Sequence, residues 1–391
     1  MPYYLSTGIL IFTGVIWLGL VVYHVLKRKL LKQATFMRIT ILLTFTLAFV
    51  LISFFFNSVQ LVLTIVGVVL PAVWQFVDGF FTQRPVEKRV AFILKAGSGY
   101  CKEVADSVTS EVRARLPKIK LDIITNSREE NHNEQLTVFA NAVRQVPDVI
   151  ILIPPPNNTD LISTAIEAQR KGIKLITIDD IFESNEFAYL NLPCPQHVGV
   201  DFDFGGRLAA KAMMRALEGK GNIVIISGPL NSRPSQERKL AFIDEIFKEP
   251  RDIVITHCYE TAWNSYEAAN QIRNLLQLGQ SVQGVFCCND KLALGVVEAY
   301  RQHEQSMGKR SVDRPIIIGF DGLKEIYRAL FDGDIYASVE VETDLQGKKV
   351  VDLLEHILNN QSLAHYHPYR ANLIMPHLLT WETVRNRGYH P

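Results

Sequence analysis

Residues 172–180 read Gly-Ile-Lys-Leu-Ile-Thr-Ile-Asp-Asp, a short aliphatic run that ends on two carboxylates. Lys174 is the only charged residue before the two carboxylates, and such near-continuous apolar segments are typical of parallel strands buried on both faces. Seven similar runs occur at 90–94, 121–125, 149–153, 222–226, 253–256, 284–287 and 315–318. Amphipathic stretches separate them, so the sequence predicts a chain of βα units.

The stretches between the runs have helical spacing. One apolar stripe comprises Leu161, Ile162, Ala165 and Ala168, and another comprises Leu208, Ala209, Ala212, Met213 and Ala216. Stripes of this kind pack on a sheet and carry no chemistry by themselves. So many βα units exceed what one compact sheet needs, and the chain begins a second set near residues 198–201. We therefore expect an α/β fold with two doubly wound, Rossmann-like lobes and a central ligand cleft.

The first 83 residues have a different composition and predict a membrane domain. Residues 7–26 are an uncharged stretch of 20, the length that a helix needs to cross the hydrocarbon core. Residues 39–77 are also uncharged, and as one helix they would measure about 58 Å, nearly twice the bilayer core. Two interpretations remain open: spans at about 39–58 and 61–77, or one span to about residue 60 followed by an interfacial segment.

Charge places the loop between the first spans in the cytoplasm, because it holds cations and no acid: Lys27, Arg28, Lys29, Lys32 and Arg38. Three spans would then put the large domain, residues 84–391, inside the cell, and two spans would put it outside. Arg84, Lys88 and Arg89 follow the last apolar stretch and favour three spans. The sequence thus predicts a multi-pass protein of the cell membrane and leaves the face of its large domain open.

Composition argues against several functions. The 41 basic and 40 acidic residues give a net charge of +1, whereas a nucleic-acid-binding protein would carry a basic excess. The cysteines number five and their spacing fits neither a zinc site nor a disulfide framework; they read as small buried apolar residues. No catalytic motif accompanies the strand ends. We therefore expect no enzyme activity, cofactor, metal or nucleic-acid partner.

Polar and aromatic residues directly after the strands are the candidate ligand contacts, because ligands of such sheets bind at the carboxyl ends of the strands. They are Lys95, Asp179, Asp180, Arg238, Trp263, Asn289 and Asp321. Each also has a structural interpretation. Lys95 and Arg238 could be solvated, the Asp pair could cap a helix, and Trp263 could cover a small core. Asp290 is expected to be the N-cap of the helix that follows Asn289.

The ordered motifs from residue 88 to 383 resemble the periplasmic sugar-binding proteins and the LacI-type regulators, especially the ribose-binding branch. The segments that carry the resemblance are 172–179, Val200-Asp201 with Gly205-Gly206, Gln236-Glu237-Arg238 with Phe242, 285–295, Ile318-Gly319-Phe320-Asp321-Gly322 and 375–380. Asp180 stands where that family usually has arginine, and Lys95 beside an acidic pair is similar to the autoinducer-2 receptors. The resemblance therefore implies a small polar ligand without implying ribose itself.

The family's architecture implies three crossings between the lobes, here near Val200-Asp201, Val341-Glu342 and His365–Tyr369. Lobe 1 would comprise about 88–200 and 342–366, and lobe 2 about 201–341 and 367–391. Carried over by position, the ligand contacts implied are Tyr100, Asp179, Trp263, Asn289 and Asp321, together with Arg238.

Two functional hypotheses follow. The chain is a membrane-anchored receptor for a monosaccharide or polyol, partnered by the lipid bilayer and by an ABC permease or a membrane signalling protein. Alternatively, it is a ligand-gated sensor–effector with a cytoplasmic binding domain, whose membrane helices are the output, since several spans exceed what a tether needs.

Overall fold

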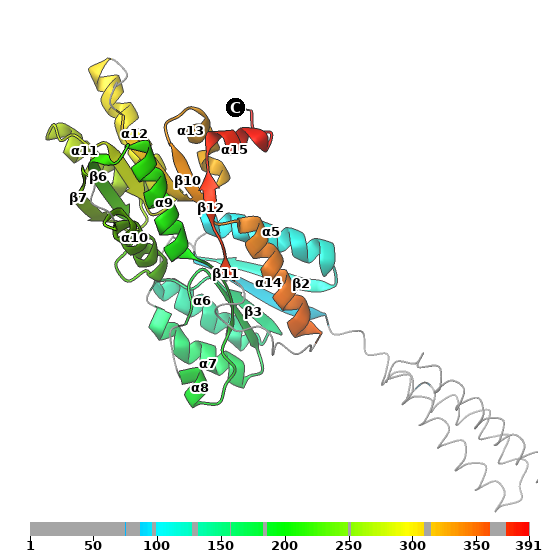
Figure 1. Ribbon diagram of the computed structural model, residues 1–391. Coiled ribbons are helices and arrows are strands. Elements are labelled where there is room, and N and C mark those ends of the chain that lie inside the picture. The colour runs from blue at the N-terminus through cyan, green and yellow to red at the C-terminus, as the bar shows by residue number, and fades with distance from the viewer. Residues whose placement is uncertain are drawn as a thin grey trace, which may run out of the picture. The chain divides into compact units, whose positions relative to one another are not determined.

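The computed structural model describes residues 87–95, 99–126, 132–156, 158–182, 186–248, 252–308, 314–359 and 373–390, together with position 75. Residues Lys88–Pro391 form one compact unit of two α/β lobes (Figure 1). The predicted fold class with two parallel-sheet lobes is thereby confirmed. The predicted membrane spans fall outside the described residues apart from position 75. Among the described residues, no helix has both the length and the apolar character needed to cross a bilayer.

Lobe 1 is built on a sheet whose described strands are all parallel and follow the order β11-β5-β4-β3-β1-β2. The strands are β1 (Lys88–Leu94), β2 (Ile119–Thr125), β3 (Val149–Leu152), β4 (Lys174–Ile178), β5 (Gln196–Val200) and β11 (Leu373–Ile374). The helices are α5 (Gly99–Arg115), α6 (His132–Arg144), η2 (Asn158–Leu161), α7 (Ile162–Arg170), α8 (Glu186–Tyr189) and α14 (Thr343–Leu358).

Helices cover both faces of the lobe 1 sheet because its strands are apolar on both sides. Val90 and Phe92 of β1 pack in one core cluster with α5 and α14, whereas Ile93 packs in another with α6 and α7. This alternation follows from the two-residue period of a strand. The predicted stripe at 161–168 lies in the second cluster, so that prediction is confirmed.

Lobe 2 has the sheet order β12-β10-β9-β8-β6-β7, in which β12 alone among the described strands runs antiparallel to its neighbour. The strands are β6 (Lys220–Ser227), β7 (Asp252–Glu260), β8 (Gly284–Cys287), β9 (Ile316–Asp321), β10 (Ala337–Glu340) and β12 (His377–Leu379). The helices are α9 (Phe202–Ala216), α10 (Arg233–Ile246), α11 (Ser265–Gln277), α12 (Asp290–Met307), η3 (Lys324–Ile326), α13 (Tyr327–Phe331) and α15 (Trp381–Asn386).

The lobe 2 sheet is likewise packed on both faces. Helices α9 and α10 share one core cluster with the strands, and α11 and α12 share the other. In the first cluster the rings of Phe242 and Phe286 stack with their centroids 4.2 Å apart. Each lobe is therefore a three-layer sandwich with its own core, and the two sheets turn the carboxyl ends of their parallel strands toward one another.

In its described parts the chain passes between the lobes three times. The first crossing is at Asp201, which follows β5 and caps α9 by accepting a hydrogen bond from the backbone N–H of Phe204 at 2.9 Å. The second is at residues 341–342, where Glu342 has a left-handed φ of +54°. The third lies between β11, which pairs with β5, and β12, which pairs with β10. The described strands β11 and β12 therefore place a crossing at residues 375–376, whereas the predicted position, 365–369, lies outside the described residues.

Candidate functional site

A cavity of about 100 Å³ lies between the lobes, at the carboxyl ends of both parallel sheets. Its lining residues are Lys95, Gly99, Tyr100, Cys101 and Asp179 from lobe 1, and Pro234, Arg238, Trp263, Asn289, Lys291, Asp321, Leu323 and Glu325 from lobe 2. The structure thus brings together all of the predicted contact residues except Asp180.

The backbone is unusual at three of these positions. Asp179, Trp263 and Asp321 have φ values of +69°, +57° and +110°, a region that residues other than glycine seldom occupy. Such conformations cost of order 1–3 kcal/mol each and cluster where a side chain must be aimed at a ligand. Asp179 directly follows β4 and Asp321 ends β9, so both carboxylates are directed from strand ends into the space between the lobes.

A buried ion pair forms the lobe 1 side of the cavity. Lys95 Nζ lies 2.6 Å from Asp179 Oδ2, and the two side chains are only 16% and 5% exposed. Burial alone would raise the pKa of Asp179, but Lys95 and Arg238 outweigh it and hold that pKa below its usual range. Burial in turn would lower the pKa of Lys95, but the charge of Asp179 raises it. Both groups are therefore charged at neutral pH.

A second ion pair forms the lobe 2 side. Arg238 Nη1 lies 3.0 Å from Asp321 Oδ1 and donates a hydrogen bond to the carbonyl oxygen of Cys288 at 2.7 Å. Its guanidinium lies 4.5 Å from the ring centroid of Phe202 and 4.2 Å from that of Phe320, within cation–π range. Burial raises the pKa of Asp321 to about 7, an effect that Arg238 opposes.

The start of α12 fixes the neighbouring loop. Asn289, rather than Asp290, is the N-cap, since its side chain accepts from the backbone N–H of Leu292 at 2.8 Å. Asp290 is fully buried and accepts from the hydroxyl of Ser338 and from the backbone N–H of Leu323. Burial and the charge of Asp321 raise the pKa of Asp290 well above its usual range. Asp290 therefore positions cavity-lining Leu323 and is not itself part of the lining.

Two aromatic side chains line the cavity. Trp263 packs so closely on Gly228 that a Cβ there would stand 2.3 Å from its ring, so the site requires glycine at 228. Trp263 also contacts both lobe 2 core clusters, so the core-covering and cavity-lining interpretations hold together. Tyr100 contacts one core cluster in each lobe, and its hydroxyl donates to Gln346 Oε1 at 2.6 Å. Gln346 donates to the carbonyl oxygen of Val341 at 2.8 Å, which links the cavity to the second crossing.

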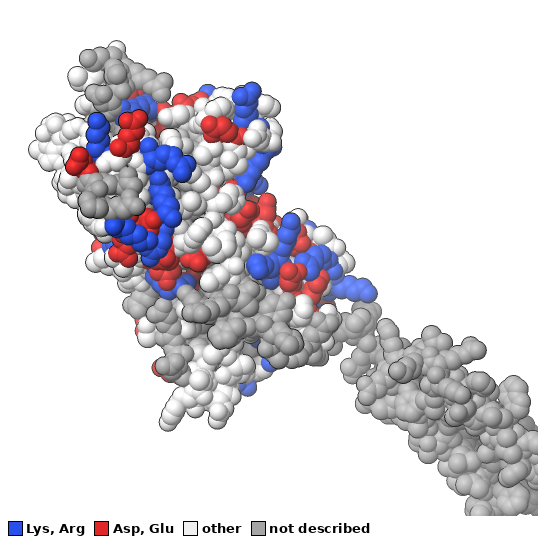
Figure 2. Space-filling view, in the orientation of Figure 1, with Lys and Arg blue, Asp and Glu red and all other residues white. Residues whose placement is uncertain are grey.

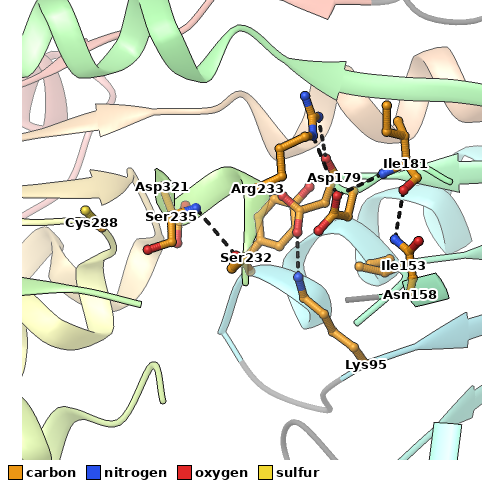
Figure 3. A network of polar contacts seen from close by, with 12 residues as sticks. Lys95, Ile153, Asn158, Asp179, Ile181, Ser232, Arg233, Ser235, Cys288 and Asp321 are labelled. Atoms are coloured by element: carbon orange, nitrogen blue, oxygen red, sulfur yellow. Dashed lines mark hydrogen bonds and ion pairs between the residues drawn. The ribbon is translucent and has the colours of Figure 1, made fainter. Parts of the chain in front are cut away.

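Asp180 lies outside the lining and faces Arg233 of lobe 2 instead. Arg233 Nε is 3.6 Å from Asp180 Oδ1, and its Nη2 donates to the carbonyl oxygen of Asp179 at 3.4 Å. Figure 3 shows Lys95 and Arg233 approaching Asp179 from opposite sides. Burial, followed by the charge of Asp179, raises the pKa of Asp180 to about 6.

Sequence reasoning missed the residues that join the lobes. Besides Arg233, Glu103 of α5 accepts from the backbone N–H of Lys324 in lobe 2 at 2.9 Å and from the hydroxyl of Thr343 at 3.3 Å. Arg233 and Glu103 lie in helices α10 and α5, and no sequence motif marks them as ligand contacts. Their partners are more than 50 residues away in the chain, so local sequence carries no mark of the pairing.

The site is chemically suited to hydrogen bonding. It offers paired cations and carboxylates from both lobes together with two aromatic faces. Among the described residues, no three His, Cys, Asp or Glu side chains are grouped so that they could hold a metal ion.

The sequence matches the model of one protein family, described as the periplasmic binding protein domain, over residues 90–362. The xylitol-binding protein of Mycolicibacterium smegmatis is 25% identical over 248 residues, which is 63% of this chain and 65% of that relative, so the chain spans just under two thirds of its length. The ribose import binding protein RbsB of Escherichia coli is 24% identical over 226 residues, covering 58% of this chain and 71% of the relative.

A solved structure shares the fold. It is an ABC transporter periplasmic solute-binding protein of Actinobacillus succinogenes with bound D-allose. It superposes with a TM-score of 0.65 at 23% identity, covering 76% of this chain and 99% of that one.

Proposed function

The chain belongs to the periplasmic binding protein domain family, and from that membership we propose that it is a non-enzymatic receptor that closes around a monosaccharide or a related polyol. The cavity carries this proposal, because it draws donors, acceptors and two aromatic faces from both lobes at once. Polyols present alternating hydroxyl groups and apolar C–H faces, and charged side chains and aromatic rings match these two surfaces.

Seven of the eight predicted residues take two roles in this proposal. Lys95, Asp179, Arg238, Asn289 and Asp321 hydrogen-bond the ligand's hydroxyl groups, and Trp263 and Tyr100 stack on its apolar faces. Because the ion pairs already neutralise the cations with carboxylates, an uncharged ligand suits the site. Asp180 does not line the cavity and is not a ligand contact in this proposal.

Thermal melting of the full chain in detergent micelles tests the proposal. The panel comprises pentoses and hexoses including D-ribose and D-allose, polyols including xylitol, autoinducer-2 and nucleosides. A ligand at about 100 times its dissociation constant adds about 2.7 kcal/mol to the free energy of unfolding. We expect one sugar or polyol to raise the melting temperature by several degrees.

Variants assign the shift to the cavity. Asp179→Asn and Trp263→Ala should abolish the ligand-induced shift, whereas Asp203→Asn, on the exposed surface of α9, should retain it. A panel in which only a nucleoside raises the melting temperature would contradict the sugar assignment, and a shift that survives both cavity variants would contradict the site.

The segment 1–83 supplies the second part of the proposal. Its uncharged stretches anchor the receptor in the cell membrane, where it delivers ligand to an ABC permease or reports it to a membrane signalling partner. The sensor–effector alternative, in which the membrane helices themselves are the output, is favoured by an uncharged stretch at 39–77 that exceeds the length of one span.

A further inference from the structure

One ion pair joins the two lobes beside the cavity without lining it. Asp180 follows β4 in lobe 1, and Arg233 is the first residue of α10 in lobe 2. Their side chains are 6% and 13% exposed, so solvent screens their attraction only in part. Arg233 also donates to the carbonyl oxygen of Asp179 and to Glu237 Oε1, at 3.4 Å and 2.8 Å. A single guanidinium therefore joins α10 to the end of β4.

The surroundings of Asp180 explain why this cation matters. Asp179 lies next in the chain and its negative charge disfavours ionisation of Asp180, whereas Lys95 and Arg233 favour it. Lys95 belongs to the same lobe as the two carboxylates and already pairs with Asp179. Arg233 approaches Asp180 from the other lobe, so separating the lobes removes its attraction from this carboxylate.

We propose that Asp180 and Arg233 form a closure contact, through which Arg233 holds the lobes together over the ligand and fixes the position of Asp179. This inference rests on the proposed receptor function and assigns Asp180 to closure instead of ligand contact. The contact exists only when the lobes meet, so its free energy favours the closed state alone. Arg233 is a positioning residue: it touches the carbonyl oxygen of Asp179 and leaves the ligand to the cavity residues.

The chain provides its own probes for lobe closure. Cys194 in lobe 1 and Cys258 on β7 in lobe 2 are exposed, contrary to the expectation of buried cysteines, whereas Cys101, Cys287 and Cys288 are buried. Spin labels at Cys194 and Cys258 of the full chain in detergent micelles report the distance between the lobes by double electron–electron resonance. The measurement is made without ligand and with saturating D-ribose, D-allose or xylitol.

Removing the charge of either Asp180 or Arg233 should shift the distances between the spin labels in the same direction. Arg233→Gln and Asp180→Asn should each lower the ratio of closed to open molecules about tenfold, and the double variant should lower it no further. The charge swap Asp180→Arg with Arg233→Asp should restore much of the closed population. Arg207→Gln, which breaks an ion pair within α9, is the matched control and should leave the distances unchanged.

The outcomes separate this inference from the receptor proposal. If the single variants retain the wild-type distances, or if their effects add in the double variant, the closure contact is overturned even when a sugar stabilises the protein. If the variants shift the ligand-free distances while no sugar or polyol has any effect, the closure contact stands and the receptor proposal fails. Failure of a single variant to fold would be recognised from its melting curve, and the charge swap then decides.

Discussion

At the scale of single residues, the sequence predicts which charged residues lie at the site, but it does not predict which of them pair with one another. The candidates that follow strands, such as Asp179 and Asp321, lie at the cavity because parallel strands end at one edge of a sheet. The partner of Asp180 could not be predicted, because Arg233 approaches from the other lobe and the relative placement of two lobes is not encoded locally. The left-handed φ values of Asp179, Trp263 and Asp321 also escaped sequence reasoning, since glycine is the usual signal for them.

His197 gives a prediction at this scale. It is 2% exposed on β5, with its Nδ1 3.0 Å from the hydroxyl of Thr177. Burial, followed by the charge of Arg233, lowers its pKa to about 3. The unfolded chain therefore binds a proton here between pH 3 and 6.5 and the folded chain does not, so stability rises with pH across that window. Between pH 7 and pH 5, protonation of His197 in the unfolded chain should lower the free energy of unfolding by about 2 kcal/mol.

The variant His197→Gln removes this titration while keeping a side chain that can hydrogen-bond to Thr177. It should lose less stability than the wild type on acidification, measured as the difference in the free energy of unfolding between pH 7 and pH 5. Comparing the two proteins isolates His197, because Asp180, whose pKa is raised, titrates in both of them. If the free energy of unfolding of the two proteins changed equally with pH, His197 would not be the group that causes the loss of stability in acid.

At the scale of elements, α5 organises the lobe 1 side of the site. Its first turn carries Tyr100 to the cavity, and further along it contacts α14, where Ser107 donates to the carbonyl oxygen of Asp344 and Arg115 pairs with Glu355. The eight apolar strands were predicted and are present as β1–β4 and β6–β9. The strands β5, β10 and β11 were missed, because their residues are of mixed character or very few, and they form strands only through neighbours distant in sequence.

Gly347 tests the contact between these helices. A Cβ at this position would stand 2.1 Å from Ser107 Oγ and 2.9 Å from the Ser107 backbone carbon. Helix propensity alone favours alanine over glycine by about 1 kcal/mol, whereas forcing atoms into a packed contact costs about 1–3 kcal/mol. We therefore expect Gly347→Ala to lower the melting temperature. Lys348→Ala, at the exposed neighbouring position, should change it little. If Gly347→Ala instead raised the melting temperature, α5 and α14 would be able to move apart without loss of stability.

At the scale of the whole molecule, the two lobes are joined by three crossings and by contacts across the cleft. Figure 2 shows opposite charges interspersed over one face of the molecule. Several of the described surface charges form ion pairs, such as Arg207 with Asp203. The two-lobed plan followed from counting βα units. The position of the third crossing could not be predicted in this way. It depends on which short strand pairs with β5, and that pairing is set by residues distant in sequence.

The two functional hypotheses differ in the face of the membrane on which they place the large domain. A reporter that is active only outside the cytoplasm, fused after residue 83, distinguishes the two functional hypotheses. Activity is expected for an uptake receptor with two spans before the domain, and silence for a sensor–effector with three. The matched control is the same reporter fused after residue 33, within the cationic loop, which should be silent in both cases. A silent fusion after residue 83, with stable expression, would rule out the uptake role.

Because the chain crosses between the lobes three times, parts of one lobe are synthesised before and after the other lobe. The core of lobe 1 includes Val350, Leu354 and Ile374, which are synthesised only after nearly all of lobe 2. At about 5–20 residues per second, roughly 7–30 seconds pass while residues 202–341 emerge. During that interval the core shared by β1 and α5 lacks α14. The nascent lobe 1 therefore cannot complete its core until the far end of the chain is made, and we expect it to expose until then the kind of apolar surface that chaperones bind.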